Sequence, residues 1–527
     1  MKEVIIIAFC LLRSFTPVIA QVTAEKIEQM LNSKQHPEAF GLSNYEQLKE
    51  LYNKTSETIF WTNASGQQNR TTLIQFLNRS EDLGLNQRDY QYDYIRSFSE
   101  PTFSLKSIND SIEAELRFSD AAIHFFSDLV YGNISPVFGY DGLNYFPRGY
   151  DIPALISKYA ILNQLKFLFD QLVDLFPQVA TLRKKIERLN QITKDSTIDE
   201  EKISSLQVSH LNKPLLIKLY LLGVTDSPTN GSDALIKKDL MEAQRQLNVL
   251  ADGVLRAPTM AELNVPLETR KQQLRLAINY YRWLSCLSRE QAVVVVNIPA
   301  AYLKVYELAT ILLEMKMIVG KPSTPTPTLT SQISEVILYP YWNVPRSIAT
   351  KELLPAIKRN PGFIDANNFQ LITNTGKIAD PYKIDWPSIS ASNFPYTLRQ
   401  STGCDNALGL IKLNFYNPGG VYLHDTPDKG LFYLNKRFFS HGCMRMEKPM
   451  ELGHLVLKNN RIAIDTLEDK GCLRNQAPIT VQADERMPVV VWYNPVDIDT
   501  SGRVIFYGDI YKKFPEKNLL AVGDKSR

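Results

Sequence analysis

The chain has 527 residues, of which 44% are hydrophobic and 22% are charged. This is the composition of an ordinary globular protein with a large core and about two to four domains. Its 59 basic and 56 acidic side chains nearly balance, which argues against binding to nucleic acid or to a membrane surface. Composition does not indicate the oligomeric state.

The first twenty residues have the pattern of a secretory signal peptide. An apolar run, residues 4–12, follows Lys2, and the small residue Ala20 fits a cleavage site before Gln21. An N-terminal membrane anchor is the alternative, but the apolar run is too short to span a bilayer. We therefore expect residues 1–20 to be removed and the protein to be exported to the periplasm or cell envelope.

Four cysteines remain after that cleavage: Cys286, Cys404, Cys443 and Cys472. So few cysteines in a chain of this length do not form a disulfide framework. If Cys443 stays free, one bridge at most joins two of the other three. The sequence does not say which pair, or whether any bridge forms.

Residues 21–220 predict a helical scaffold domain, because apolar residues recur there at steps of three and four, as in 172–186. Residues 221–288 begin with a loop rich in Gly, Asp and Pro and continue as a small helical module. The module contains a turn at Asp252-Gly253 and ends in an amphipathic helix over 267–284.

The pattern changes to β structure at residue 289. Residues 292–299 and 302–306 predict two strands, and alternation over 410–415 predicts another. Between them, 321–406 begins with a proline-rich loop and is expected to be largely irregular from 359 onward. A helix is expected over 447–465. The β-rich domain is predicted to span 289–510 and a basic tail 511–527.

One stretch of this domain contains the candidate catalytic residues. Tyr422 ends a predicted strand, His424 follows it, and Ser440-His441-Gly442-Cys443 forms a small turn. A cysteine nucleophile needs an imidazole to take its proton, and either His424 or His441 could serve. The backbone of Gly442 could approach a developing oxyanion. The plain alternative is a buried, inert cysteine.

These residues resemble the signature of the L,D-transpeptidases with a YkuD-type catalytic domain: a His, a spacer, then Ser/Thr-His-Gly-Cys, a hydrophobic residue and Asn or Arg. The resemblance implies that Cys443 is the nucleophile, His424 the general base and His441 a supporting residue, with Gly442 contributing an oxyanion N–H. It also implies substrate-binding roles for Ser440, Arg445 and Tyr422.

The flanking sequence extends this resemblance toward the large periplasmic murein L,D-transpeptidases. Residues 127–136 are similar to their helical region, and 343–349 with 393–400 to a capping insertion, here 321–406. Arg346 and Arg399 in the cap could bind substrate carboxylates or serve only as structural partners. Residues 252–259 resemble a peptidoglycan-binding module, although Arg256 and Ala257 depart from its usual small residues. Glycan contact through 221–288 and simple packing therefore both stay open.

The resulting fold prediction is α+β: a helical scaffold, a small helical module and a mainly β catalytic domain with a cap. The resemblance implies a cysteine-dependent acyltransferase of cell-wall biogenesis and cell shape, which a carbapenem would acylate. It would form 3→3 cross-links between peptidoglycan stems, from a donor tetrapeptide to an acceptor diamino acid, with release of D-alanine. An L,D-carboxypeptidase and a non-catalytic wall-binding scaffold are the alternatives. No cofactor and no metal is expected, because the histidines near Cys443 lack further ligands at suitable spacing.

Overall fold

The computed structural model describes residues 22–32, 40–53, 58–101, 103–195, 198, 200–228 and 231–514. The predicted signal peptide and the end of the predicted tail, from 515 on, lie outside the described residues. Among the described residues, no helix combines the length and the hydrophobicity needed to cross a lipid bilayer. The chain forms two compact units, which are described separately.

The first unit comprises the described residues up to Glu81, together with Asn86–Leu129 and Tyr150–Leu172. It is helical, and α5 is its central element, because eleven buried apolar side chains among 112–130 give it core contacts along its length. The helices are α1 (Ala24–Asn32), α2 (Tyr45–Asn53), α3 (Gln67–Asn78), α4 (Tyr92–Ser97), α5 (Ile108–Tyr131), α6 (Ile152–Ile161) and α7 (Leu165–Leu172).

Glu115 of α5 organises the segment that precedes α3. Its buried carboxylate accepts hydrogen bonds from the main-chain N–H groups of Phe60, Trp61 and Thr62 at 2.6–3.2 Å. Burial raises the pKa of Glu115, and these donors partly oppose that shift. A buried acid with this many donors fixes an otherwise irregular stretch of chain against the helix.

The second unit begins with helices that pack around α12. The C-terminal half of α12 is buried on all sides, because it lies between the other helices and the β-sheet and shares one apolar core with both. Ser232 caps α10 by accepting from the N–H of Leu235. The helices are α8 (Pro177–Thr193), α9 (Lys213–Leu221), α10 (Asp233–Gln246), α11 (Ala257–Leu263) and α12 (Leu267–Glu290).

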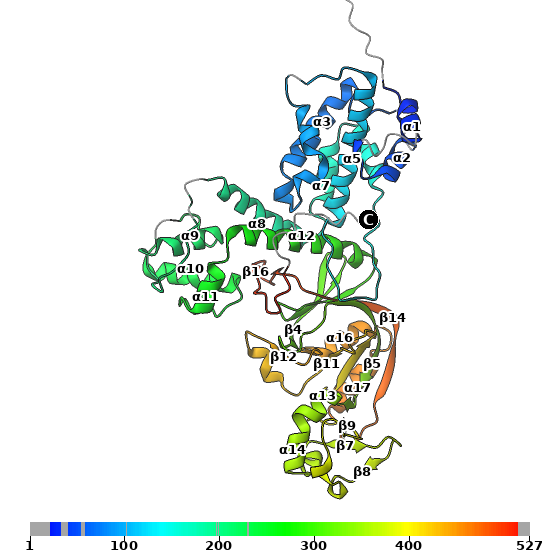
Figure 1. Ribbon diagram of the computed structural model, residues 1–527, viewed down its shortest axis with the longest axis vertical. Helices are drawn as coiled ribbons and strands as arrows, with labels where there is room; N and C mark the ends of the chain where they lie inside the picture. The colour runs from blue at the N-terminus through cyan, green and yellow to red at the C-terminus, as the bar shows by residue number, and fades with distance from the viewer. Residues whose placement is uncertain are drawn as a thin grey trace, which may run out of the picture. The chain divides into compact units, whose positions relative to one another are not determined.

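A ten-stranded sheet forms the centre of the second unit, and β14 runs beside β5 along its length (Figure 1). The strand order is β1-β5-β10-β11-β13-β4-β3-β2-β14, with β12 paired to β4. Because β14 pairs with both β2 and β5, the sheet closes on itself and protects its edges. Its strands are β1 (Tyr140–Asp141), β2 (Val293–Asn297), β3 (Tyr302–Glu307), β4 (Thr310–Gly320), β5 (Leu329–Leu338), β10 (Ile411–Phe415), β11 (Leu423–His424), β12 (Phe438–Ser440), β13 (Met444–Met446) and β14 (Ile479–Trp492). A separate hairpin joins β15 (Val496–Ile498) to β16 (Val504–Phe506).

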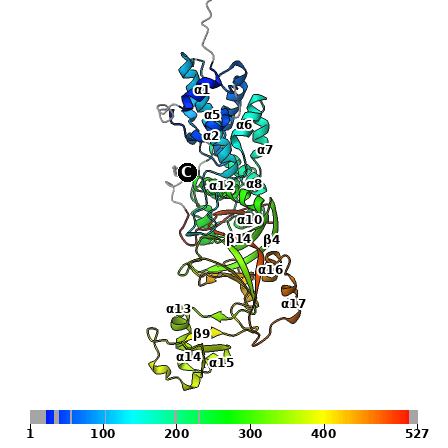
Figure 2. The same ribbon diagram turned by 90° about the vertical axis from the view of Figure 1, so that its right-hand side faces the viewer.

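Two helices follow β13 and share the apolar core inside the sheet. They are α16 (Pro449–Val456) and α17 (Ile462–Lys470), which lie side by side (Figure 2). Gly453 lets them approach: a Cβ there would lie 2.9 Å from Ile411 and 3.0 Å from Ile464. The sequence predicted one helix over 447–465, whereas residues 457–461 separate two.

The cap differs from its prediction. The segment 359–406, expected to be largely irregular, contributes to a small α+β subdomain with its own apolar core, which includes Ile357, Leu371 and Trp386. Its strands are too short and too often interrupted by polar residues to stand out in the sequence. They are β6 (Trp342–Asn343), β7 (Phe369–Ile372), β8 (Ile378–Ala379) and β9 (Thr397–Gln400), in the order β6-β9-β7-β8. The helical elements include α13 (Arg346–Ile348), the π-helix η5 (Ala349–Leu353), α14 (Leu354–Arg359) and α15 (Phe363–Ala366).

The α+β class is confirmed. The two units divide the chain differently from the predicted domains, however. Residues 130–149 and 173–220 of the predicted scaffold belong to the second unit, together with the predicted module 221–288. The reason is packing, because α8 shares its core with α12 and the sheet. Within the predicted cap, β5 is a strand of the main sheet, so the cap core draws on residues after 341.

Candidate active site

The predicted nucleophile lies where two short strands meet. β11 and β13 are parallel, with Leu423 opposite Met444 and His424 opposite Arg445. The N–H of Met444 donates to the carbonyl of Tyr422 at 3.0 Å, which continues the ladder toward Cys443. Side chains alternate between the faces of a strand. Tyr422, His424, Cys443 and Arg445 therefore share one face of the sheet.

His424 is held in one orientation. Its side chain is buried, its Nδ1 lies 2.5 Å from the main-chain oxygen of Asp425, and the ring of Tyr422 meets it edge-on at 5.6 Å. A carbonyl oxygen only accepts, so Nδ1 carries the proton. The other nitrogen, Nε2, is then left as an acceptor, which is the state that a general base requires.

The loop after His424 is fixed by the side chain of Asp425. Its carboxylate accepts from the N–H of Leu410 at 2.9 Å and from Nζ of Lys429 at 2.6 Å. Gly409 has φ +60° and leaves no room for a Cβ beside that carboxylate. These contacts fix the carbonyl of Asp425, and through it the imidazole of His424.

The turn before Cys443 uses its own polar groups. The hydroxyl of Ser440 donates to the carbonyl of Cys443 at 2.5 Å and accepts from the N–H of Gly442 at 3.2 Å. Gly442 has φ +115°, where other residues are strained, and its carbonyl accepts from Oγ1 of Thr326. The hydroxyl of Ser440 and the N–H of Gly442 are thus engaged within the turn. Their predicted roles toward substrate stay predictions.

Charge and burial act in opposite directions on the thiol. Burial raises the pKa of Cys443, while hydrogen bonds from Tyr422 and the positive charges of Lys412 and Arg445 lower it; burial prevails. The pKa of His424 falls to about 3, first because of burial and then because of the charges of Arg445 and Lys412. At neutral pH the resting pair is therefore a thiol and a neutral imidazole.

Lys412 is a site residue that the sequence analysis did not single out. It lies directly opposite His424 across the β10–β11 ladder, and its Nζ is 4.0 Å from the centre of the Tyr422 ring. Burial lowers the pKa of Lys412, and the charge of Cys443 opposes that shift. Its position among the alternating apolar residues of 411–415 was the available signal: a half-buried cation on the polar face of a strand.

The side chain of His441 contacts the cap. Its Nε2 lies 2.7 Å from Oε1 of Glu352, in the cap, and 3.2 Å from Nζ of Lys321. His441 thus connects the turn before Cys443 to the cap, whereas His424 shares a sheet face with the thiol. The assignment of His424 as general base and His441 as a supporting residue agrees with this placement and stays a prediction.

The predicted arginines fall into two groups. Arg445 lies opposite His424, and its Nη1 is 3.5 Å from Asp428. Arg346 donates to the carbonyls of Phe394 and Ala391 inside the cap. Only Arg445 is thus placed beside the thiol by the sheet.

Arg399 is likewise engaged within the cap. Its guanidinium donates to Oε1 of Gln370 at 2.6 and 3.0 Å and lies over the ring of Tyr341 at 4.4 Å. Arg346 and Arg399 therefore have the structural partners that the sequence analysis left as the alternative to carboxylate binding.

Two segments of the chain are similar to known protein domains. Residues 291–464 match the model of the L,D-transpeptidase catalytic domain, YkuD, and residues 46–186 match that of a scaffold domain. A curated protein of Haemophilus influenzae, named as an L,D-transpeptidase, is 33% identical over 267 residues, which are 50% of this chain and 52% of that protein. The chain thus spans about half the length of this relative. Residues 291–464 are therefore similar to a YkuD-type L,D-transpeptidase catalytic domain, and residues 46–186 are similar to a scaffold domain.

The chain also has partial similarity to solved structures. An L,D-transpeptidase from Mycobacterium smegmatis is 14% identical, with 38% of this chain and 58% of that chain covered and a TM-score of 0.18. A cysteine-to-serine variant of the Enterococcus faecium L,D-transpeptidase is 12% identical, with 43% and 65% covered and a TM-score of 0.17.

Proposed function

We propose that this protein is a peptidoglycan L,D-transpeptidase that forms 3→3 cross-links through a cysteinyl acyl-enzyme. The observation that carries the proposal is the shared sheet face of Cys443 and His424, with the imidazole oriented by the carbonyl of Asp425. A thiol beside an oriented, neutral imidazole is suited to acyl transfer. The match of residues 291–464 to the L,D-transpeptidase catalytic domain suggests peptidoglycan as the substrate class. A protein exported to the periplasm or cell envelope would meet that substrate.

In the first half-reaction, His424 takes the proton of Cys443 as the sulfur attacks the carbonyl of the third stem residue. An S–C bond forms, the C–N bond to the terminal D-alanine breaks, and the imidazolium returns the proton to the departing amine. Because burial holds the resting pair neutral, charge separation occurs only when substrate is present. The positive charges of Lys412 and Arg445 favour the thiolate as it develops.

In the second half-reaction, the side-chain amine of a diamino acid on another stem attacks the thioester. A C–N bond forms, the C–S bond breaks, and His424 carries the amine proton back to the sulfur of Cys443. Water in place of the amine would give an L,D-carboxypeptidase. The same intermediate serves both reactions, so the acceptor alone separates them.

The test uses purified disaccharide-tetrapeptides and mass spectrometry. The full chain should form a covalent adduct on Cys443 and release D-alanine, and dimeric products should exceed trimmed monomers. Cys443→Ala should give neither adduct nor product. Cys286→Ala is the matched control, because Cys286 is a second free thiol, buried, with its pKa raised to about 11. Trimmed monomers alone would replace the proposal by the carboxypeptidase, and turnover by Cys443→Ala would refute the nucleophile.

A further inference from the structure

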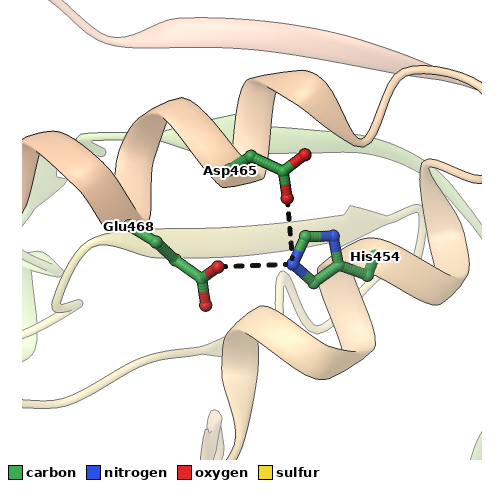
Figure 3. Close-up of side chains that lie close together, drawn as sticks. All are labelled: His454, Asp465 and Glu468. Carbon is green, nitrogen blue, oxygen red and sulfur yellow. Dashed lines mark ion pairs between the residues drawn. The ribbon is translucent and has the colours of Figure 1, made fainter.

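A second cluster of chemically active side chains lies outside the residues around Cys443. Figure 3 shows the imidazole of His454, from α16, facing the carboxylates of Asp465 and Glu468, which lie one helical turn apart on α17. Nε2 of His454 is 3.7 Å from Oδ1 of Asp465 and 3.5 Å from Oε2 of Glu468. All three donor atoms lie within 4.8 Å of one another.

These separations suit a shared metal ion better than hydrogen bonds. An N–H···O hydrogen bond spans about 2.7–3.2 Å, and both distances from His454 exceed that range. Two ligands of a tetrahedral zinc ion, each about 2.0–2.2 Å from the metal, are separated by about 3.4 Å. The imidazole nitrogen therefore lies near the edge length of such a tetrahedron from each carboxylate.

The negative charges of Asp465 and Glu468 also favour a bound cation. In the part of the chain that the structure describes, Asp465 and Glu468 form ion pairs only with His454. With the imidazole neutral, the cluster carries two uncompensated negative charges. A divalent cation would balance them, and one imidazole with two carboxylates is a donor set that zinc accepts.

The site is also pre-organised. Gly453, next to His454, packs against Ile464, next to Asp465, so closely that a Cβ at Gly453 would lie 3.0 Å from the Ile464 side chain. The packing that requires a glycine there fixes the spacing of the adjacent ligands. The three side chains are 29–54% exposed, so an ion has access from solvent and a water molecule can complete its coordination.

We propose that His454, Asp465 and Glu468 bind a divalent transition metal, Zn²⁺, which clamps α16 to α17. The role is structural. α16 packs on β10, the strand that carries Lys412, so the clamp would stabilise the support of the active site. Zinc binding at this cluster would not depend on whether the protein catalyses the proposed reaction.

The test measures Zn²⁺ bound to the full chain by equilibrium dialysis, with any affinity tag removed. Because the thiol of Cys443 could itself bind zinc, the measurement is made in Cys443→Ala. One Zn²⁺ per chain is expected, together with a rise in Tm of about a few degrees at saturation. His454→Gln and Glu468→Gln should each weaken binding by about 10-fold or more. Glu468→Gln preserves size and keeps the test valid if His454→Gln misfolds.

His210→Gln is the matched control. Its imidazole lies 2.9 Å from the carboxylate of Asp233, at hydrogen-bond distance, and among the described residues it belongs to no group of three possible metal ligands. It should leave zinc binding unchanged. Co²⁺ bound to Cys443→Ala should give the visible spectrum of a tetrahedral ion, which disappears in His454→Gln. No Zn²⁺ bound at about 100 μM free metal, or binding unaffected by both Gln variants, would overturn the proposal.

Discussion

Nδ1 of His424 lies 2.5 Å from the main-chain oxygen of Asp425, the next residue in the chain. A side-chain carboxylate could be lost by one mutation, but a main-chain carbonyl is present whatever residue occupies position 425. The orientation of the imidazole therefore depends on backbone geometry, which Gly409, Leu410 and Lys429 maintain through their contacts with Asp425.

The pH dependence of acylation by a carbapenem should distinguish the two histidines. The pKa of His424 is lowered to about 3, so a base at this position stays neutral, and the wild-type rate should not fall as pH decreases through 6.5. His424→Ala should lose about 10²–10⁴ in rate near neutral pH. It should recover in part at alkaline pH, where the thiol ionises without help, above its raised pKa.

His441→Ser is the comparison for that experiment. His441 contacts Glu352 and Lys321, so its loss should cost only about 10-fold. Stopped-flow measurements of the acylation rate from pH 4 to pH 10 would decide whether His424 or His441 is the general base. Near-normal acylation by His424→Ala with an inactive His441→Ser would reverse the assignment.

Gly409→Ala should reduce both stability and acylation. Its φ of +60° costs a non-glycine residue about 1–2 kcal/mol, and its Cβ would displace the carboxylate of Asp425. The carbonyl that orients His424 would then move, so the acylation rate should fall more than stability alone explains. Gly430→Ala is the control, because nothing lies within 4 Å of its added Cβ. Equal acylation rates of the two variants would contradict the positioning role of Asp425.

The contact of Glu352 with His441 should hold the cap on the turn before Cys443. Glu352→Gln removes the charge from a partly exposed pair, so global stability should change by only about 0–1 kcal/mol. Hydrogen exchange of η5 and α14 should nevertheless become faster. Lys383→Met, which breaks an ion pair within the cap, should leave that exchange unchanged. Unaltered exchange in Glu352→Gln would show that other contacts hold the cap.

The same measurement tests whether the cap is mobile enough to gate the site around Cys443. The segment 359–406 contains elements with an apolar core of its own, so its protection should be intermediate. We expect exchange faster there than in β10, because the cap strands are short and partly exposed. Exchange as slow as in β10 would rule out gating by this segment on that timescale.

Cys404 and Cys472 form a disulfide across 68 residues. It joins the end of the cap, just after β9, to the segment between α17 and β14. In the chain-entropy account, closing a loop of this size contributes about 4 kcal/mol. The double variant Cys404→Ser with Cys472→Ser should lower the Tm of the second unit, as measured by calorimetry. A reductant should lower the wild-type Tm similarly and leave that of the variant unchanged.

Local sequence patterns were sufficient to predict the features that depend on neighbouring residues. The spacing of His424, Ser440, His441, Gly442 and Cys443 identified the candidate site. Residue patterns located α12 and the strands β2, β3 and β10 of the second unit, because amphipathic helices and apolar strands are recognisable within a short window of sequence. These features depend on chemistry within one stretch of chain.

The remaining features depend on contacts between residues that are far apart in the chain, and only the folded structure shows these contacts. The β10–β11 register placed Lys412 opposite His424, and the cap brought Glu352 to His441 across 89 residues. Packing also brings Cys472 to Cys404, with which it forms a disulfide. Because α8 shares its core with α12 and the sheet, it belongs to the second unit and not to the helices of the first unit. Strand register and helix packing follow from burying apolar faces against segments far away in the chain. No local pattern specifies those partners, so the electrostatics of Cys443 and the cluster of His454, Asp465 and Glu468 on α16 and α17 arise only in the folded chain.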